Sequence, residues 1–218
     1  IKLLNKEYFF PMKSSFYLYI MSPMMMFILI MMTWMIYPFY SNLLFFENNM
    51  LYFLCMMSLG IYSLILAGWS SNSSFSMIGS IRSIAQSISY EVVFSIIILI
   101  MMTNINSMNL FNLIFFNKFN NFSLIYFPLM LIILFTMLAE INRTPFDLSE
   151  GESELVSGFN IEYSSSKFIL IFLSEYSSII FMMFLFCLLM FMSNNFNIFF
   201  YLKVTMMIFF ITWIRMTL

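Results

Sequence analysis

The sequence predicts an all-α protein: a polytopic transmembrane helix bundle, with about six spans in this chain and one long acidic loop. Of the 218 residues, 62% are hydrophobic and only 9% are charged, and the mean hydropathy is +0.95. A soluble domain is nearer half apolar and a quarter charged. The apolar residues also form continuous runs, whereas a membrane β-barrel needs short alternating segments. The chain is therefore expected to form a single transmembrane domain over residues 1–218.

Six apolar segments are long enough to cross about 30 Å of hydrocarbon, which takes about 20 helical residues. The predicted spans are residues 15–37, 50–69, 77–103, 124–141, 168–192 and 198–217. Between the third and fourth spans, the Asn- and Phe-rich residues 104–123 are expected to form a surface connector. The connection between the fourth and fifth spans is longer and has a different composition.

This second connection, the loop of residues 142–167, concentrates carboxylates. Its acidic residues are Asp147, Glu150, Glu152, Glu154 and Glu162. A serine three residues before a glutamate, Ser149 before Glu152, is typical of a helix N-terminus and predicts a short helix at about 150–157. Apolar side chains interleaved with the acids indicate that the loop folds against protein or an apolar ligand. Crowded carboxylates can take up or release protons when a nearby charge changes.

The basic residues indicate how the chain is oriented in the membrane. Six spans place both chain ends on one side, together with the acidic loop. Seven of the nine basic residues lie on or near that side: Lys2, Lys6, Lys13, Arg82, Arg143, Lys167 and Arg215. Only Lys118 and Lys203 lie on the other. By the positive-inside rule, the basic side faces the matrix, or the cytoplasm in a bacterium.

The third predicted span carries polar residues at helical spacing. One stripe holds Ser80, Ser83, Ser87 and Glu91, and a second stripe holds Arg82, Gln86 and Ser89. A helix with two polar faces is expected to lie inside the bundle. Glu91 lies about 13 Å along the axis from Arg82, which is too far for an ion pair. Glu91 is either satisfied by neighbouring hydroxyls or part of a proton relay, and the relay is favoured because a charge at mid-bilayer costs about 2.5–3.5 kcal/mol.

Two further glutamates lie in the predicted spans. Glu140 ends the fourth span, where an ordinary interfacial charge and a functional acid are equally consistent with the sequence. Glu175 and Tyr176 lie about two turns into the fifth span, among serines and with no basic residue nearby in sequence. A buried carboxyl group in such a place is expected to hold its proton near neutral pH and so to act as a proton carrier. Because the chain has no histidine, a proton path would use these carboxylates, tyrosine, serines and water.

Composition excludes several kinds of site. With no histidine and only Cys55 and Cys187, the chain has too few ligands for a four-cysteine iron–sulfur cluster, a His-bound haem or a typical zinc site. The net charge of −1 is not that of a nucleic-acid-binding domain. No glycine-rich phosphate-binding motif is found. No cofactor or metal is therefore expected to bind to this chain itself.

Several stretches are specific enough to be compared with known families. The most specific is AEINRTPFDLSEGESELVSGFNIEY at residues 139–163, followed by LSEY at 173–176. The others are GSIRSIAQSISYEV at 79–92, AGWSSNSSF at 67–75, WIR at 213–215 and the opening IKLLNKE at 1–7. Together they resemble the family of NADH dehydrogenase subunit 1, the quinone-site membrane subunit of respiratory complex I, and Tyr8 after the opening stretch departs from the usual pattern. The resemblance covers nearly the whole chain in order. It implies that the family's first and last transmembrane helices have no counterpart here.

The resemblance also implies an activity. Subunits of this family form the membrane part of the ubiquinone chamber and begin the carboxylate path that couples quinone reduction to proton translocation. By matching positions, the proton-relay residues are Glu91, Glu140, Glu175 and Tyr176. The quinone-path and loop acids are Asp147, Glu150, Glu152, Glu154 and Glu162, and their basic partners are Arg82, Arg143 and Arg215.

Partners and location follow from the same resemblance. Ubiquinone is the expected substrate, and FMN and iron–sulfur clusters are expected in partner subunits, so this chain would be part of an H⁺-translocating NADH:ubiquinone reductase without a redox centre of its own. The expected neighbours are the hydrophilic quinone-module subunits, other membrane-arm subunits and the lipid bilayer. The expected location is the mitochondrial inner membrane, with multiple passes. The 30 Phe and 24 Met residues are typical of an AT-rich animal mitochondrial genome that reads ATA as Met.

Three other functions remain open. The homologous membrane subunit of a membrane-bound hydrogenase would share these motifs. A free-standing ion-coupled transporter would also carry intramembrane acids, but an internal repeat or paired Gly/Pro-broken helices would then be expected, and neither is found. A purely structural anchor would leave the buried glutamates without an explanation.

Overall fold

In the computed structural model, helices form the scaffold of the described residues, which are 2–37, 46–119, 122–149, 151, 155, 158–191 and 198–217. Five helices are long and apolar enough to cross a membrane. They are α1 (Phe16–Thr33, extended by the 3-10 turn η1, Trp34–Ile36), α2 (Asn49–Ser71), α3 (Ser74–Thr103), α8 (Ser165–Phe191) and α9 (Ile198–Thr217). The prediction of an all-α transmembrane bundle is confirmed.

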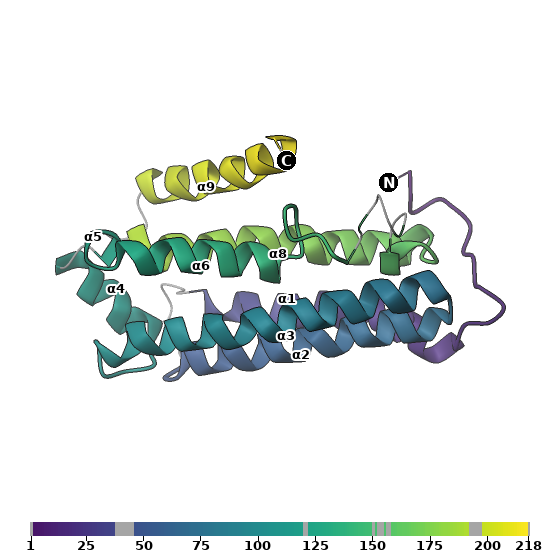
Figure 1. The fold of residues 1–218 in the computed structure, drawn as a ribbon, viewed down its shortest axis with the longest axis horizontal. Coiled ribbons are helices and arrows are strands. Elements are labelled where there is room, and N and C mark those ends of the chain that lie inside the picture. Colours follow the sequence, from purple (N-terminus) through teal and green to yellow (C-terminus); the bar gives the residue numbers. More distant parts are fainter. Residues whose placement is uncertain are drawn as a thin grey trace.

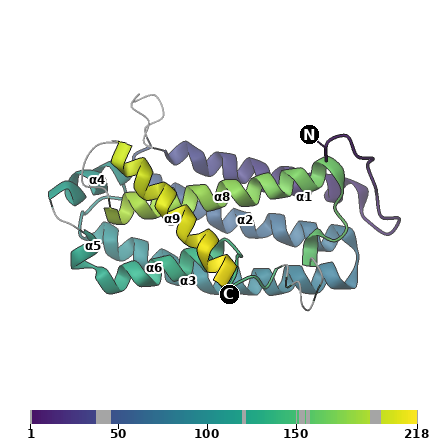
Figure 2. The ribbon, with the colours of Figure 1, turned by 90° about the horizontal axis from the view of Figure 1, so that it is seen from above.

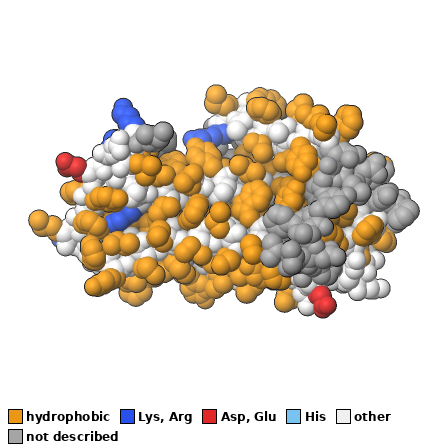
Figure 3. Space-filling model, turned by 180° about the vertical axis from the view of Figure 1, so that it is seen from behind, with side chains coloured by type: hydrophobic (Ala, Val, Ile, Leu, Met, Phe, Trp, Pro, Cys, Tyr) orange, Lys and Arg blue, Asp and Glu red, His pale blue; other side chains and the backbone are white. Residues whose placement is uncertain are grey.

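The long helices form a bundle with one oblique member. Helices α1, α2, α3 and α8 run along the same axis, and α1 packs against both α2 and α8 while α2 packs against α3 (Figure 1). Helix α9 packs on α8 and crosses it at an angle (Figure 2). Hydrophobic side chains cover most of the described part of the face seen in Figure 3, as expected of a surface that meets lipid or other apolar helices.

The segment predicted as a surface connector, residues 104–123, is folded into the bundle instead. It contains helix α4 (Leu110–Phe119), and helix α5 (Phe122–Ile125) follows. Leu110 and Leu113 are fully buried, and the side-chain amide of Asn117 donates to the carbonyl of Leu189 at 3.0 Å. The expectation holds for the exposed Asn104, Asn106 and Asn112 but is wrong for the helical part that packs on α8. The asparagines suggested a solvated loop, but at least one of them satisfies a backbone group at the end of α8.

The sixth apolar helix, α6 (Phe127–Glu140), is shorter than its predicted span. Tyr126 lies in a turn that separates α5 from α6, and 14 residues extend only about 21 Å. Helix α6 packs on α3 and ends partway along the bundle, while α3 and α8 continue beyond it (Figure 1). The acidic loop therefore begins within the length of the bundle, and Glu140 lies at that point.

The acidic loop continues along α3 from the end of α6 to the start of α8 (Figure 1). Its residues 141–149 contain turns and a cis peptide bond between Thr144 and Pro145. The 3-10 turn η3 (Gly158–Asn160) packs on α3, and Gly158 has a φ of 54°, in the left-handed region that favours glycine. The predicted helix at 150–157 lies largely outside the described residues.

Close approach of α2 to α3 depends on Gly68. A Cβ atom at this position would lie 2.1 Å from Ser80 Oγ and 2.3 Å from Ser80 Cβ, so the two helices would have to separate. We expect Gly68→Ala to lower the free energy of unfolding by about 1–3 kcal/mol. The double substitution Gly68→Ala/Ser80→Gly should recover most of that loss, apart from about 1 kcal/mol for a glycine inside a helix.

Thermal unfolding of the four proteins (parent, two singles and double) measures this coupling. Gly60→Ala in the same helix is the control, because its added Cβ meets nothing within 4 Å. If the double variant loses as much stability as the two single variants together, the proposed contact between Gly68 and Ser80 is contradicted.

Candidate functional site

A cavity of about 150 Å³ lies between α1, α2, α8 and the beginning of the acidic loop. Its apolar wall comes from α1 and α2 and includes Met26, Met57 and Ile61. Its polar wall comes from the end of α6, the loop and α8, and contains Glu140, Arg143, Asn142, Ser149, Ser174, Glu175 and Ser178. The structure thus brings together two of the three glutamates predicted within the spans, although they are 35 residues apart in sequence.

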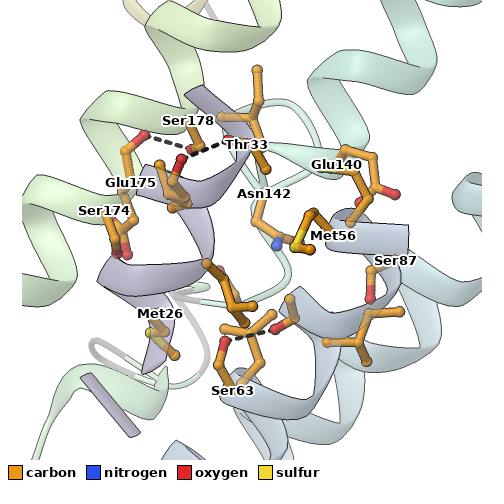
Figure 4. Close-up of a pocket in the computed structure, with 18 of the residues that line it drawn as sticks. Met26, Thr33, Met56, Ser63, Ser87, Glu140, Asn142, Ser174, Glu175 and Ser178 are labelled. Carbon is orange, nitrogen blue, oxygen red and sulfur yellow. Dashed lines mark hydrogen bonds between the residues drawn. The ribbon is translucent and has the colours of Figure 1, made fainter. Parts of the chain in front are cut away.

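Glu140 and Glu175 lie on opposite sides of this cavity, with Asn142 between them in the view of Figure 4. Asn142 has a φ of 52°, and its Oδ1 atom is buried and accepts no hydrogen bond from the described residues. A buried acceptor of this kind is normally satisfied by water or a ligand. The space between the two carboxyl groups is therefore suited to hold water.

Arg143 forms an ion pair with Glu175, which the sequence did not lead us to expect. The distance from Arg143 Nη2 to Glu175 Oε2 is 3.1 Å, and the side chains are 9% and 20% exposed. The guanidinium also lies 5.4 Å from the centre of the Tyr176 ring. No basic residue lies near Glu175 in sequence, but the turn after α6 brings Arg143 to it from 32 residues away.

Hydroxyl groups on the cavity wall are oriented toward their own helices. Ser63, Ser174 and Ser178 each donate to the carbonyl three residues earlier, at 2.6, 2.6 and 2.7 Å, and Thr33 and Ser87 do the same. Each oxygen therefore keeps lone pairs that can accept a hydrogen bond from water in the cavity. The polar wall offers acceptors, two carboxyl groups and one guanidinium.

Glu91 lies next to this site but outside the cavity. It is partly buried on α3, and its carboxyl group interacts electrostatically with that of Glu140. Ser80, Ser83 and Ser87, on the same predicted stripe, are buried within the bundle. On the second predicted stripe Gln86 is buried, whereas Ser89 is exposed and donates within its own helix. The three serines of the first stripe are thus buried, whereas Gln86 is the buried residue of the second stripe.

The other predicted site residues that the structure describes do not line the cavity. Tyr176 is 49% exposed and contacts Arg143 through its ring. Asp147 accepts a hydrogen bond from Ser149 at 3.3 Å. Glu162 is partly buried, and Arg215 is exposed in the last turn of α9. Arg82 is partly buried on α3. Glu150, Glu152 and Glu154 lie outside the described residues.

A buried aromatic cluster separates the cavity from the N-terminal segment. Tyr19 and Tyr163 stack with ring centres 4.5 Å apart, and Phe159 belongs to the same cluster and also lines the cavity. The Tyr163 hydroxyl is hydrogen-bonded to Ser22 at 2.8 Å, and burial raises its pKa. This phenol therefore stays protonated.

Lys167 is the unusual member of this region. Its Nζ atom is buried without a hydrogen-bond partner among the described residues and lies 3.6 Å from the Phe10 ring centre and 4.3 Å from that of Tyr19. Burying an ammonium costs several kcal/mol, and two cation–π contacts return about 1–2 kcal/mol each. We therefore expect Lys167→Met, which keeps the length and removes the charge, to raise the free energy of unfolding by about 1 kcal/mol.

Lys167→Ala is the control, because it removes both the charge and the packing and should destabilise the protein. Thermal unfolding in lipid measures both variants. A methionine variant less stable than the alanine variant would mean that the charge itself holds this region together.

Sequence reasoning missed the residues that shape the cavity. Gly60, Met56 and Met57 lie in an ordinary apolar run, and no sequence feature separates them from lipid-facing neighbours. Asn142 could have been found, because an asparagine directly after a helix end is typical of a left-handed turn. Arg143 was predicted as a site residue, but its pairing with Glu175 was not predicted.

Comparison with known proteins gives the family. A family model described as NADH dehydrogenase matches residues 1–218. NADH-ubiquinone oxidoreductase chain 1 of Aedes aegypti is 45% identical over 218 residues, covering 100% of this chain and 70% of the relative. The proteins of the same name from Locusta migratoria and Apis mellifera ligustica are 46% and 40% identical, over 100% and 99% of this chain and 69% and 70% of their own lengths. The chain belongs to the NADH dehydrogenase family of membrane proteins, with relatives named NADH-ubiquinone oxidoreductase chain 1.

Proposed function

We propose that this chain is a membrane core subunit of proton-pumping NADH:ubiquinone oxidoreductase, located in the mitochondrial inner membrane. In this role it forms part of the ubiquinone chamber and starts the carboxylate path that couples quinone reduction to proton translocation. Electrons arrive from the FMN and iron–sulfur clusters of partner subunits. The names of its relatives favour this function over a hydrogenase subunit or a free-standing transporter.

The observation that carries the coupling role is the shared cavity of Glu140 and Glu175. Both carboxyl groups, Arg143 and Asn142 border one space inside a bundle of apolar helices, and Asn142 Oδ1 accepts no hydrogen bond from the described part of the chain. Carboxyl groups separated by water-sized space can exchange a proton through water, and Glu91 extends the series on the side of Glu140. The acidic loop connects this series to the side on which quinone would be reduced.

The electrostatic scale is sufficient for coupling. Moving one proton across 100 mV requires about 2.3 kcal/mol. A new negative charge within about 7 Å of a carboxyl group, at an effective dielectric constant of about 20, changes its interaction energy by about 2.4 kcal/mol. Charge formed near the acidic loop during quinone reduction would raise the proton affinity of Glu140, and the ion pair of Glu175 with Arg143 would then adjust.

Replacing the two acids in the assembled complex tests the proposal. We expect Glu140→Gln and Glu175→Gln each to lower NADH-driven quinone reduction and proton pumping at least about tenfold, because a positioned acid–base group contributes about 10²–10⁴-fold. NADH oxidation by a water-soluble acceptor, which needs only the partner subunits, should stay unchanged. The control is Glu47→Gln, an exposed glutamate in the turn before α2. Normal pumping and turnover in both glutamine variants would refute the relay.

A further inference from the structure

The side chain of Gln86, which no part of the relay uses, links α3 to the end of α6 and to the acidic loop. Gln86 lies in the middle of α3 and is only 5% exposed. Its single amide nitrogen, Nε2, donates one hydrogen bond to the carbonyl of Ala139 and another to the carbonyl of Phe146, each at 2.8 Å. Both amide hydrogens are thus used on backbone oxygens of a different element.

These two carbonyls bracket the segment that carries the site. Residues 140–145 lie between them, and this stretch contains Glu140 and Arg143. Ala139 is in the last turn of α6, and its carbonyl also accepts a hydrogen bond from the backbone N–H of Asn142 at 3.2 Å. One side chain therefore fixes both ends of a six-residue turn to the adjacent helix. A second α3 side chain supports the same point, because the Tyr90 ring lies edge-on to Phe146 with centres 5.6 Å apart.

The two hydrogen bonds from Gln86 require a side chain that is uncharged and donates two hydrogen bonds from one atom. Two carbonyl oxygens that face one atom need two N–H groups on it, which glutamine provides and glutamate does not. The Oε1 atom of Gln86 is buried and has no hydrogen-bond partner among the described residues. The two carbonyls alone therefore set the orientation of the amide, since the reverse orientation would place three acceptor oxygens together.

We infer that Gln86 is a positioning residue for the proton relay. Gln86 holds residues 139 and 146 against α3. It thereby fixes the distance between Glu140, at the end of α6, and Glu91, which lies on α3 with Gln86. It also directs Arg143 toward Glu175 on α8. The inference rests on the proposed function. It predicts that the geometry of the turn, and with it the rate of proton transfer, depends on two hydrogen bonds outside the cavity.

The test compares Gln86→Glu, Gln86→Leu and the control Ser89→Ala in the assembled complex, with rates expressed per assembled complex. Ser89 is the control because it is exposed on the same helix and bonds only to that helix. We expect both Gln86 variants to lower quinone-dependent turnover and proton pumping about tenfold. The KM for ubiquinone should stay within about twofold of wild type, and NADH oxidation by a water-soluble acceptor should be unchanged. Ser89→Ala should behave as wild type.

A pH series separates positioning from general structural damage. In Gln86→Glu, a protonated carboxyl group can donate one of the two hydrogen bonds and a carboxylate can donate none, so the rate relative to wild type should rise as the pH falls. The same ratio should stay flat for Gln86→Leu. The surrounding charged or titratable groups, which are present in all variants, are Arg82, Tyr90, Glu91, Glu140, Arg143 and Asp147.

The outcomes distinguish this inference from the function on which it rests. If Glu140→Gln and Glu175→Gln abolish pumping while both Gln86 variants turn over normally, the inference fails and the relay stands. If Gln86→Leu does not assemble, the inference is judged on Gln86→Glu alone. A rate relative to wild type that does not change with pH would then overturn it. Normal pumping in the two acid variants would instead refute the relay itself.

Discussion

Arg143→Gln should lower the free energy of unfolding by about 4 kcal/mol and reduce quinone-dependent turnover at least about tenfold. The substitution leaves the Glu175 carboxylate in a largely buried place without its cation, 3.1 Å away in the parent protein. Breaking a buried ion pair by removing one partner costs about 3–5 kcal/mol. The lower end applies because the Glu175 side chain is 20% exposed. Loss of the contact with Tyr176 adds about 0.5–1 kcal/mol.

A double-substitution cycle isolates the ion pair from the other contacts of Arg143. The variant Arg143→Gln/Glu175→Gln has no unpaired charge, so it should recover about 2 kcal/mol of stability relative to Arg143→Gln alone. It should not recover turnover, because the Glu175 carboxyl group is absent. Thermal unfolding and quinone reduction, measured on the same preparations, give both quantities. Additive stability losses would show that the two side chains do not interact.

Gly60→Leu should reduce quinone-dependent turnover and pumping about tenfold or more without lowering stability. Gly60 lines the cavity, and a Cβ added there meets nothing within 4 Å. A leucine side chain would therefore project into the space between the carboxyl groups and displace water from it. Replacing a glycine inside a helix also removes a cost of roughly 0.5–1 kcal/mol, so the melting temperature should stay level or rise.

Two matched substitutions control for the change at Gly60. Gly60→Ala adds one carbon, leaves most of the cavity open and should keep turnover near that of the parent protein. Gly60→Ser adds a hydroxyl of similar size and should do the same. The prediction requires a size dependence, with alanine and serine active and leucine inactive. Equal activity of all three variants would mean that protons do not pass through this space.

The transmembrane fold could be predicted from the sequence because hydrocarbon imposes a simple rule. Long apolar runs must be helical, and the five long helices overlap the predicted ranges closely. The predictions failed in the connecting segments and at one helix boundary, where this rule does not decide the structure. Residues 104–123 were read as a loop because asparagine is polar, yet Asn117 is buried against a helix end. The predicted fourth span was too long because the turn at Tyr126 has no strong sequence signal.

The candidate site could be predicted as residue types but not as contacts. A carboxyl group in an apolar run requires a reason wherever it lies, so Glu140 and Glu175 could be identified from the sequence alone. Their shared cavity could not, because it depends on α6 ending partway along the bundle and on the turn that follows (Figure 1). The pairing of Arg143 with Glu175 spans 32 residues and arises from the same turn. Local pattern carries no information about such contacts.

Infrared difference spectroscopy of the assembled complex, recorded on reduction of bound ubiquinone, tests the central claim most directly. If Glu140 exchanges a proton with the cavity when quinone is reduced, the spectrum should contain a carboxylic-acid C=O band that is lost in Glu140→Gln and kept in Glu47→Gln. The band should also be lost or shifted in Gly60→Leu, where the space between the acids is filled. An unchanged carboxyl region in Glu140→Gln would contradict the account.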